Sequence, residues 1–180
     1  MVGRSLFSLL AIAAVAIQSC AASFNENTYK IKASTYGSLA VSEAGPGALV
    51  EVFDGGEYQE WELRPASRPD HFEIALPRSP LYVAPAQEGP FVQLRFQPYE
   101  WRFQRNPDGQ YTIERTDKEE EPWTLTVSPI RIFPPRAATA PAGAPYPRET
   151  WSLIRADGSQ QETRNHCGPR RLSRNSFYPQ

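Results

Sequence analysis

Trp61-Glu62-Leu63 recurs as Trp101-Arg102-Phe103 and again as Trp151-Ser152-Leu153. Each triplet places a tryptophan and an apolar residue two positions apart, so both side chains fall on one face of a β-strand. Three copies of one pattern in a single chain indicate an internal repeat, and the residues between the copies should complete the repeating unit.

Each unit contains three further strand patterns ahead of its tryptophan. The first pairs an aromatic residue with an isoleucine two positions later, and the next two alternate apolar with other residues. The first strands are predicted at 29–31, 72–74 and 111–113, the second at 39–41, 81–83 and 123–125, and the third at 50–53, 92–96 and 130–133. In the last unit a Pro- and Ala-rich insertion, residues 134–147, separates the third strand from Trp151.

Twelve short strands in three units of four predict an all-β fold. Turn-forming residues separate the strands, as in Asp54-Gly55-Gly56. A propeller blade also has four strands in about 40 residues, but a propeller needs at least about four blades. Three units therefore favour a β-trefoil over residues 27–155, a closed six-stranded barrel capped by three hairpins. We expect the repeated residues Trp61, Trp101 and Trp151 to lie in its core.

The two ends of the chain differ from the repeats. Residues 1–22 have the pattern of a secretory signal peptide, because an apolar run at 6–17 is too short to span a bilayer and small residues follow it. The polar residues 157–180 show no apolar periodicity, which predicts a disordered tail. Signal cleavage would remove Cys20 and leave Cys167 as the single cysteine, so we expect a secreted protein without an intramolecular disulfide.

Composition narrows the possible functions. The formal net charge is −1 at pH 7, which argues against nucleic acid or an anionic membrane as the main partner. Only two histidines are present, and no pattern supplies a nucleophile with a base, a carboxylate pair or a metal site. The acidic run 119–121 is expected at a solvated hairpin tip. We therefore expect a monomeric binding protein, not an enzyme, with no metal, no cofactor and no membrane contact after signal cleavage.

One loop has the features of a protease-binding segment. Pro77-Arg78-Ser79-Pro80 joins the first and second predicted strands of the second unit. Proline restricts both its own backbone and that of the preceding residue, so the loop should lose little entropy on docking. An arginine suits the acidic specificity pocket of a trypsin-like protease. The alternative is an inert proline-rich turn with a solvated arginine.

Two other loops are secondary candidates for protease binding. Arg64 and Arg68 lie in the predicted connection between the first two units, although Pro69 would make the bond after Arg68 a poor one to cleave. Glu43 and Ala44 lie between the second and third strands of the first unit, in a loop without a basic residue.

Residues 100–155 carry motifs in a distinctive order. Glu100-Trp101 is followed by Asp108-Gly109, then by Tyr111-Thr112-Ile113, and finally by Glu149-Thr150-Trp151. This order resembles the fungal β-trefoil serine-protease inhibitors of the cospin/cnispin type. The resemblance implies reversible, substrate-like inhibition of trypsin-like proteases through one barrel loop, with no cofactor.

The resemblance also bears on which loop would act. In that family the inhibitory loop joins the second and third strands, which here is 42–48 and contains no Lys, Arg or Asn. The related mycocypins inhibit cysteine proteases through other loops, including the one equivalent to Pro77–Pro80. The sequence thus predicts a secreted protease inhibitor, with a trypsin-like or cysteine protease as partner and Arg78 as the specificity residue.

A ricin-B-like lectin is the alternative, because it is also a β-trefoil. Its units each carry Gln-x-Trp, which Gln59-Glu60-Trp61 matches, whereas Tyr99-Glu100-Trp101 and Glu149-Thr150-Trp151 do not. Glycans are therefore an alternative class of ligand. A secreted interaction module without inhibitory activity is a third possibility.

Overall fold

The computed structural model describes residues 28–118, 120–144 and 149–157. Within these residues the chain forms twelve β-strands and no helix. No described helix therefore reaches the length and apolarity that crossing a membrane would require. The predicted signal peptide, residues 1–22, and nearly all of the predicted tail, 157–180, lie outside the described residues.

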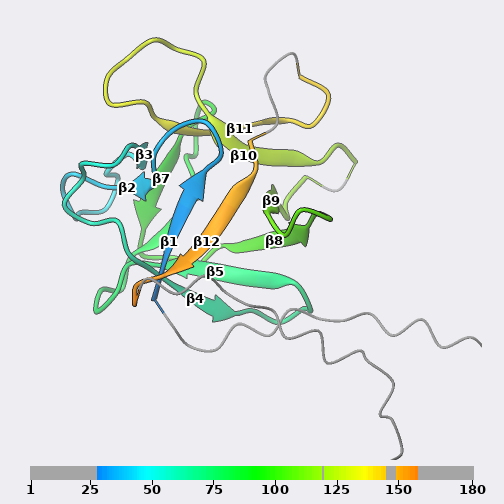
Figure 1. Cartoon of the computed structure of the whole chain (residues 1–180), viewed down its shortest axis with the longest axis horizontal. Coiled ribbons are helices and arrows are strands. Elements are labelled where there is room, and N and C mark those ends of the chain that lie inside the picture. The colour runs from blue at the N-terminus through cyan, green and yellow to red at the C-terminus, as the bar shows by residue number, and fades with distance from the viewer. Residues whose placement is uncertain (1–27, 119, 145–148, 158–180) are drawn as a thin grey trace, which may run out of the picture.

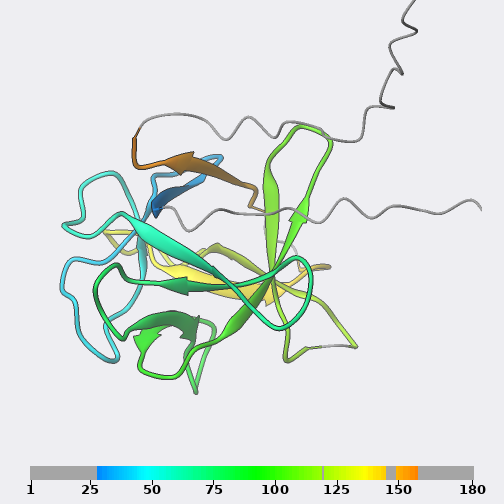
Figure 2. The same cartoon turned by 90° about the horizontal axis from the view of Figure 1, so that it is seen from below.

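Six of the strands form a barrel. They are β1 (Thr28–Ala33), β4 (Trp61–Pro65), β5 (His71–Ala75), β8 (Glu100–Arg105), β9 (Tyr111–Arg115) and β12 (Trp151–Arg155). Antiparallel pairing runs from β1 to β4, β5, β8, β9 and β12 in turn. β12 then pairs with β1 along the length of both strands, so the ring closes (Figures 1 and 2). Closure leaves the barrel without a free sheet edge.

The other six strands form three hairpins, one in each unit. These are β2 (Leu39–Ala40) with β3 (Glu51–Val52), β6 (Tyr82–Pro85) with β7 (Val92–Arg95), and β10 (Trp123–Val127) with β11 (Ala137–Pro141). The hairpins also contact one another, because Val50 N donates to Val92 O at 2.9 Å and Ala137 N donates to Val50 O at 2.8 Å. A closed six-stranded barrel with three such hairpins is a β-trefoil, as the repeat predicted.

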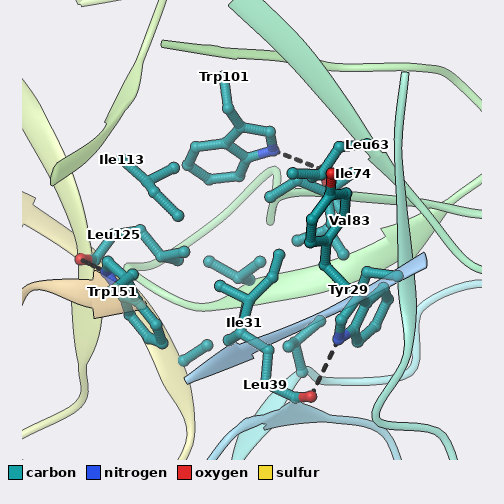
Figure 3. Packing of buried hydrophobic residues seen from close by; sticks show 14 of the residues in the cluster. Tyr29, Ile31, Leu39, Leu63, Ile74, Val83, Trp101, Ile113, Leu125 and Trp151 are labelled. Carbon is teal, nitrogen blue, oxygen red and sulfur yellow. Dashed lines mark hydrogen bonds between the residues drawn. The ribbon is translucent and has the colours of Figure 1, made fainter. Parts of the chain in front are cut away.

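The core tryptophans occupy three equivalent environments. All three side chains have 0% exposure, and each indole N–H donates to a backbone carbonyl in the second strand of its own unit. Figure 3 labels Trp101 and Trp151 among the core residues around them. The bonds run from Trp61 to Leu39 (2.9 Å), from Trp101 to Val83 (2.8 Å) and from Trp151 to Leu125 (3.1 Å). Around them lie the three predicted isoleucines, Ile31, Ile74 and Ile113, each with 0% exposure. Burial with a satisfied indole N–H explains why this position keeps tryptophan.

The tryptophan bonds correct one detail of the predicted repeat. The sequence pattern aligned Leu39 with Leu81, but Leu39 has the role of Val83 and Leu125. Strand pairing agrees, because Leu39 pairs with Val52 and Val83 pairs with Leu94. The sequence cannot show this two-residue shift in the alignment of the units, because apolar residues alternate and a slip of two residues keeps every side chain on the same face.

The third strand of the last unit is a second correction. The predicted strand 130–133 is an exposed loop, in which Ile130, Ile132 and Phe133 are 51%, 41% and 87% exposed. It stands out in Figure 1 as the yellow loop between β10 and β11. The strand is instead β11, inside the segment that the sequence interpreted as an insertion. Flanking prolines at 129, 134 and 135 offer no N–H for a ladder.

Alanine fits the place where the hairpins meet. Ala137 lies where the other two units have Val50 and Val92, and all three side chains have 0% exposure. Ala138 and Thr139 beside it are each only 2% exposed. Residues 137 and 139 make the hydrogen bonds to the other two hairpins, so tertiary contacts override the higher strand propensity of the isoleucine segment.

Candidate functional site

The loop predicted to bind a protease forms a tight turn between β5 and β6. Leu76 N donates to Leu81 O at 2.9 Å, and Ser79 N donates to Leu76 O at 3.1 Å. Arg78 is exposed and has a φ of 57°, in the left-handed region that non-glycine residues rarely adopt. A substrate-like loop offers its protease an extended backbone. The docking predicted for Arg78 would therefore require this turn to open.

The secondary candidates lie in different settings. Arg64 lies inside β4 and not in the connecting loop that the sequence predicted. It pairs with Glu62 at 2.6 Å and donates to Tyr82 Oη at 3.0 Å. The hydrogen bond to Glu62 raises the pKa of Arg64. Arg68 is exposed, 3.9 Å from a carboxylate oxygen of Glu100.

Glu43 and Ala44 are exposed in the turn of the first hairpin. Arg64 contacts Tyr82 of β6, the strand that follows the Pro77–Pro80 turn. Arg64 and the Pro77–Pro80 turn therefore lie on neighbouring elements.

A groove that the sequence analysis did not identify lies where the first hairpin meets β7. We call it the hairpin groove; its volume is about 460 Å³. It is lined by Pro46, Gly47, Gln87, Gln93, Leu94, Arg95, Phe96 and Gln97. Its walls are held together by the backbone, because Gly47 N donates to Leu94 O and Leu94 N donates to Ala48 O, both at 2.8 Å. Gly47 has a φ of 84°, which explains the glycine in this turn.

The lining of the hairpin groove combines amides, a guanidinium and an aromatic ring. Arg95 Nη2 lies 3.4 Å from Gln97 Oε1, and among the described residues no carboxylate lies within ion-pair distance of Arg95. The phenyl ring of Phe96 is 61% exposed, although phenylalanine is usually buried. The groove thus offers several hydrogen-bond donors and acceptors beside an apolar surface.

A second groove lies at the single Gln-x-Trp motif. We call it the junction groove; it measures about 370 Å³ and is lined by Lys30, Gly56, Glu57, Tyr58, Gln59, Glu60, Leu76 and Pro77. Gln59 Nε2 donates to Gly56 O at 2.9 Å, so this glutamine stabilises the turn before β4. The motif's tryptophan is buried in the core. The groove also reaches the turn that carries Arg78, since Pro77 is part of its wall.

Neither groove has the residues of a metal centre. Across the described ranges, no group of three or more His, Cys, Asp or Glu side chains is arranged to hold a metal ion. Glu120 and Glu121 of the acidic run are exposed, whereas residue 119 lies outside the described residues.

Comparison with known proteins identifies the fold and no family. No family model matches the sequence, and no curated protein matches it either. Among solved structures, the Rhizoctonia solani agglutinin matches with a TM-score of 0.60 at 20% identity, over 74% of this chain and 98% of the agglutinin. A mosquitocidal holotoxin matches with a TM-score of 0.62 at 13% identity, over 73% of this chain.

The third structure compared is the Polyporus squamosus lectin bound to the human-type influenza-binding epitope Neu5Acα2-6Galβ1-4GlcNAc. It matches with a TM-score of 0.56 at 14% identity, over 74% of this chain. This chain spans 17% of the holotoxin and 50% of the Polyporus lectin. These similarities show the β-trefoil fold, and the lectins among them share the architecture of the predicted alternative.

The hairpin groove had one usable signal in the sequence. Phe96 follows the alternating strand 92–95 and is flanked by Arg95 and Gln97, so an aromatic side chain stands among polar ones at a strand end. The interpretation of 92–96 as a core strand concealed this signal. The opposing wall, Pro46 and Gly47, comes from another unit, and no pattern along the chain brings the two together.

Proposed function

We propose that this chain is a secreted, non-enzymatic protein that binds carbohydrate in the hairpin groove. The observation that carries the proposal is the exposed ring of Phe96 beside the side chains of Arg95 and three glutamines. A pyranose has one apolar C–H face and a rim of hydroxyls. An aromatic ring can contact the face, while amides both donate to and accept from the hydroxyls.

Charge in the groove favours an acidic glycan over a neutral one. Arg95 is the only charged side chain in the lining of the hairpin groove, and its guanidinium can bind a carboxylate through two hydrogen bonds. Two of the similar structures are an agglutinin and a lectin, and the second is bound to a glycan that contains Neu5Ac. These proteins share only the fold with this chain, so they support the ligand class and not a particular sugar.

A glycan array with matched variants tests this function. The mature chain should bind a subset of glycans, and sialylated or uronic-acid glycans should rank above neutral ones. Phe96→Ala should weaken binding about 3- to 10-fold and Arg95→Ala by at least as much. Phe133→Ala removes an even more exposed ring outside the groove and should leave binding unchanged. Binding to no glycan, or equal loss with Phe133→Ala, would reject the proposal.

Protease inhibition through Pro77–Pro80 is a second candidate. It is favoured by the exposure of Arg78 between two prolines, and disfavoured by the left-handed, hydrogen-bonded turn. The mature chain should then slow trypsin at micromolar concentration, and Arg78→Ala should abolish the effect. Papain serves as the cysteine-protease arm of the same assay. Full activity of both proteases at a large excess of the chain would end this candidate.

A further inference from the structure

The barrel has three equivalent junctions, where the start of a unit's last strand lies beside the end of a first strand. β4 begins beside the end of β5, β8 beside β9, and β12 beside β1. Two sequence positions lie next to each junction in every unit. The position two residues before the core tryptophan holds Gln59, Tyr99 and Glu149, and the position four residues after the core isoleucine holds Arg78, Asp117 and Thr35.

The junction of the second unit is closed by a tyrosine. Tyr99 Oη donates to Asp117 Oδ1 at 2.7 Å and accepts from Thr116 N at 3.3 Å. The Tyr99 ring packs edge-on against Trp101, with 4.9 Å between ring centroids. Burial, followed by the bond to Asp117, raises the pKa of Tyr99, so the phenol keeps its proton. A side chain of the protein thus fills the space between β8 and β9.

The junction of the third unit is closed by a carboxylate. Glu149 is 2% exposed, and its Oε1 accepts from Ser34 Oγ at 2.5 Å and from Thr35 N at 3.2 Å. Thr35 Oγ1 also lies 3.3 Å from Glu149 Oε2. An acidic side chain therefore fits this junction when donors surround it.

The junction of the first unit is open, and this opening is the junction groove. Gln59 turns away to Gly56 O instead of crossing to the opposite strand. Pro77 lies where Ser34 donates its N–H to Thr150 O in the third unit, and proline has no N–H to donate. Two changes of residue thus remove the closing contact, and a groove of about 370 Å³ lies at this place.

The residues around the junction groove indicate what closes it. Arg78 holds the position that Asp117 and Thr35 hold at the closed junctions, and Lys30 lines the groove from β1. Among the described residues, neither Lys30 nor Arg78 has an ion-pair partner. Lys30 is the cation in the groove wall, and Arg78 follows Pro77, the last residue of that wall. Because the equivalent junction of the third unit holds the carboxylate of Glu149, a carboxylate is the group that fits beside these cations.

We propose that the junction groove binds an acidic side chain of a polypeptide partner, in the place that Glu149 fills at the third junction. The closed junctions show that protein side chains fit this space. Glu57 and Glu60 also line the groove and are exposed, so they repel a run of acidic residues and attract basic ones. The groove therefore selects a single Glu or Asp with basic neighbours. This inference does not depend on carbohydrate binding in the hairpin groove.

Fluorescence anisotropy with a matched pair of peptides tests the proposal. One labelled peptide carries a glutamate between two lysines, and the other carries glutamine at the same position. At low ionic strength the affinity of the glutamate peptide should exceed that of the glutamine peptide by a factor of about 10 or more, because glutamine cannot make a charge-assisted hydrogen bond. Added salt should weaken the binding. Equal binding of the two peptides, or binding of neither, overturns the proposal.

Variants locate the binding in the groove. Gln59→Tyr with Arg78→Asp copies the closed junction of the second unit and should abolish peptide binding without lowering Tm, which excludes misfolding as the cause. Arg78→Ala should weaken binding at least 10-fold, whereas Arg131→Ala removes another exposed arginine and should change nothing. Persistent binding in the double variant overturns the assignment to this groove.

A competition arm separates a peptide from a sugar acid as the carboxylate source. Millimolar 3′-sialyllactose should leave the bound glutamate peptide in place. Its complete displacement by this sugar, combined with loss of sugar binding in Arg78→Ala, would assign the groove to an acidic glycan and overturn the proposal. Arg95→Ala should leave peptide binding intact, so failure of the hairpin-groove function does not affect this result.

Discussion

In the core of the barrel the three units are nearly identical, whereas the three junctions at the strand ends differ, two being closed in different ways and one open. Each core tryptophan is fully buried and bonds to the same strand position of its unit. At the junctions, Tyr99 and Glu149 each close one and Gln59 leaves one open. A closed core tolerates no vacancy in any unit because a cavity is costly. An open junction is tolerated because it reaches solvent, where water replaces the missing contact.

The largest expected effect is loss of a core tryptophan. Trp101→Ala should lower the free energy of unfolding by roughly 3–5 kcal/mol, because it creates a cavity and leaves the Val83 carbonyl without its donor. Urea denaturation measures it. If the three tryptophans are energetically as well as geometrically equivalent, Trp61→Ala and Trp151→Ala should lower the free energy of unfolding by a similar amount. A loss below about 1 kcal/mol for any of them would contradict the equivalence.

A smaller effect is expected where the hairpins differ. Buried Glu51 in the first hairpin pairs with Arg136 and accepts from Ser42 Oγ at 2.6 Å. Arg136→Ala should cost about 2–3 kcal/mol, because a buried carboxylate loses its cation. Adding Glu51→Gln removes the charge and should recover more than half of that loss. Thermal unfolding of the single and double variants measures this, and no recovery would show that the arginine acts through packing.

The closed junction of the second unit should respond to pH. Hydrogen bonds from Arg115, at 2.9 and 2.6 Å, lower the pKa of Asp117 from 3.8 to about 2. A lowered folded-state pKa gives stability that is complete above about pH 4 and is lost as pH falls through 2. The side chain of Asp117 is 47% exposed, so solvent screening limits the gain to below about 1 kcal/mol.

Comparing the parent chain with Asp117→Asn from pH 6 to pH 2 tests this. The parent should be slightly more stable at pH 6, and the difference should shrink as the solution becomes more acidic. A difference that grows toward pH 2 would have the wrong sign and would contradict the depressed pKa.

The smallest effect is expected at the exposed loop between β10 and β11. Phe133 is 87% exposed, and its ring meets Phe53 edge-on at 6.3 Å between centroids. Phe133→Ser should change the unfolding free energy by less than about 0.5 kcal/mol. Calorimetry can detect a larger loss, which would show that this loop belongs to the core as the sequence first suggested.

The repeat carried enough information for the fold, and the local patterns misled where contacts between units decide. Period-two apolar residues around Trp61, Trp101 and Trp151 predicted the barrel strands, because burial of one face is a local requirement. The same rule placed the third strand of the last unit at Ile130 and Ile132 and not at Ala138, because strand propensity does not show which segment pairs with the other hairpins. For function, the sequence identified the exposed Arg78 turn but neither groove as a whole. Each groove is built from residues of two units.

What the sequence determined by itself is the three-fold barrel and its core, because alternation of apolar side chains is written along each strand and repeated three times. Only the tertiary structure decided which segment completes the last hairpin, which junction stays open, and where Phe96 and Arg95 meet the first hairpin. Those outcomes depend on the packing of segments that are distant in the chain, which no local pattern of side chains records.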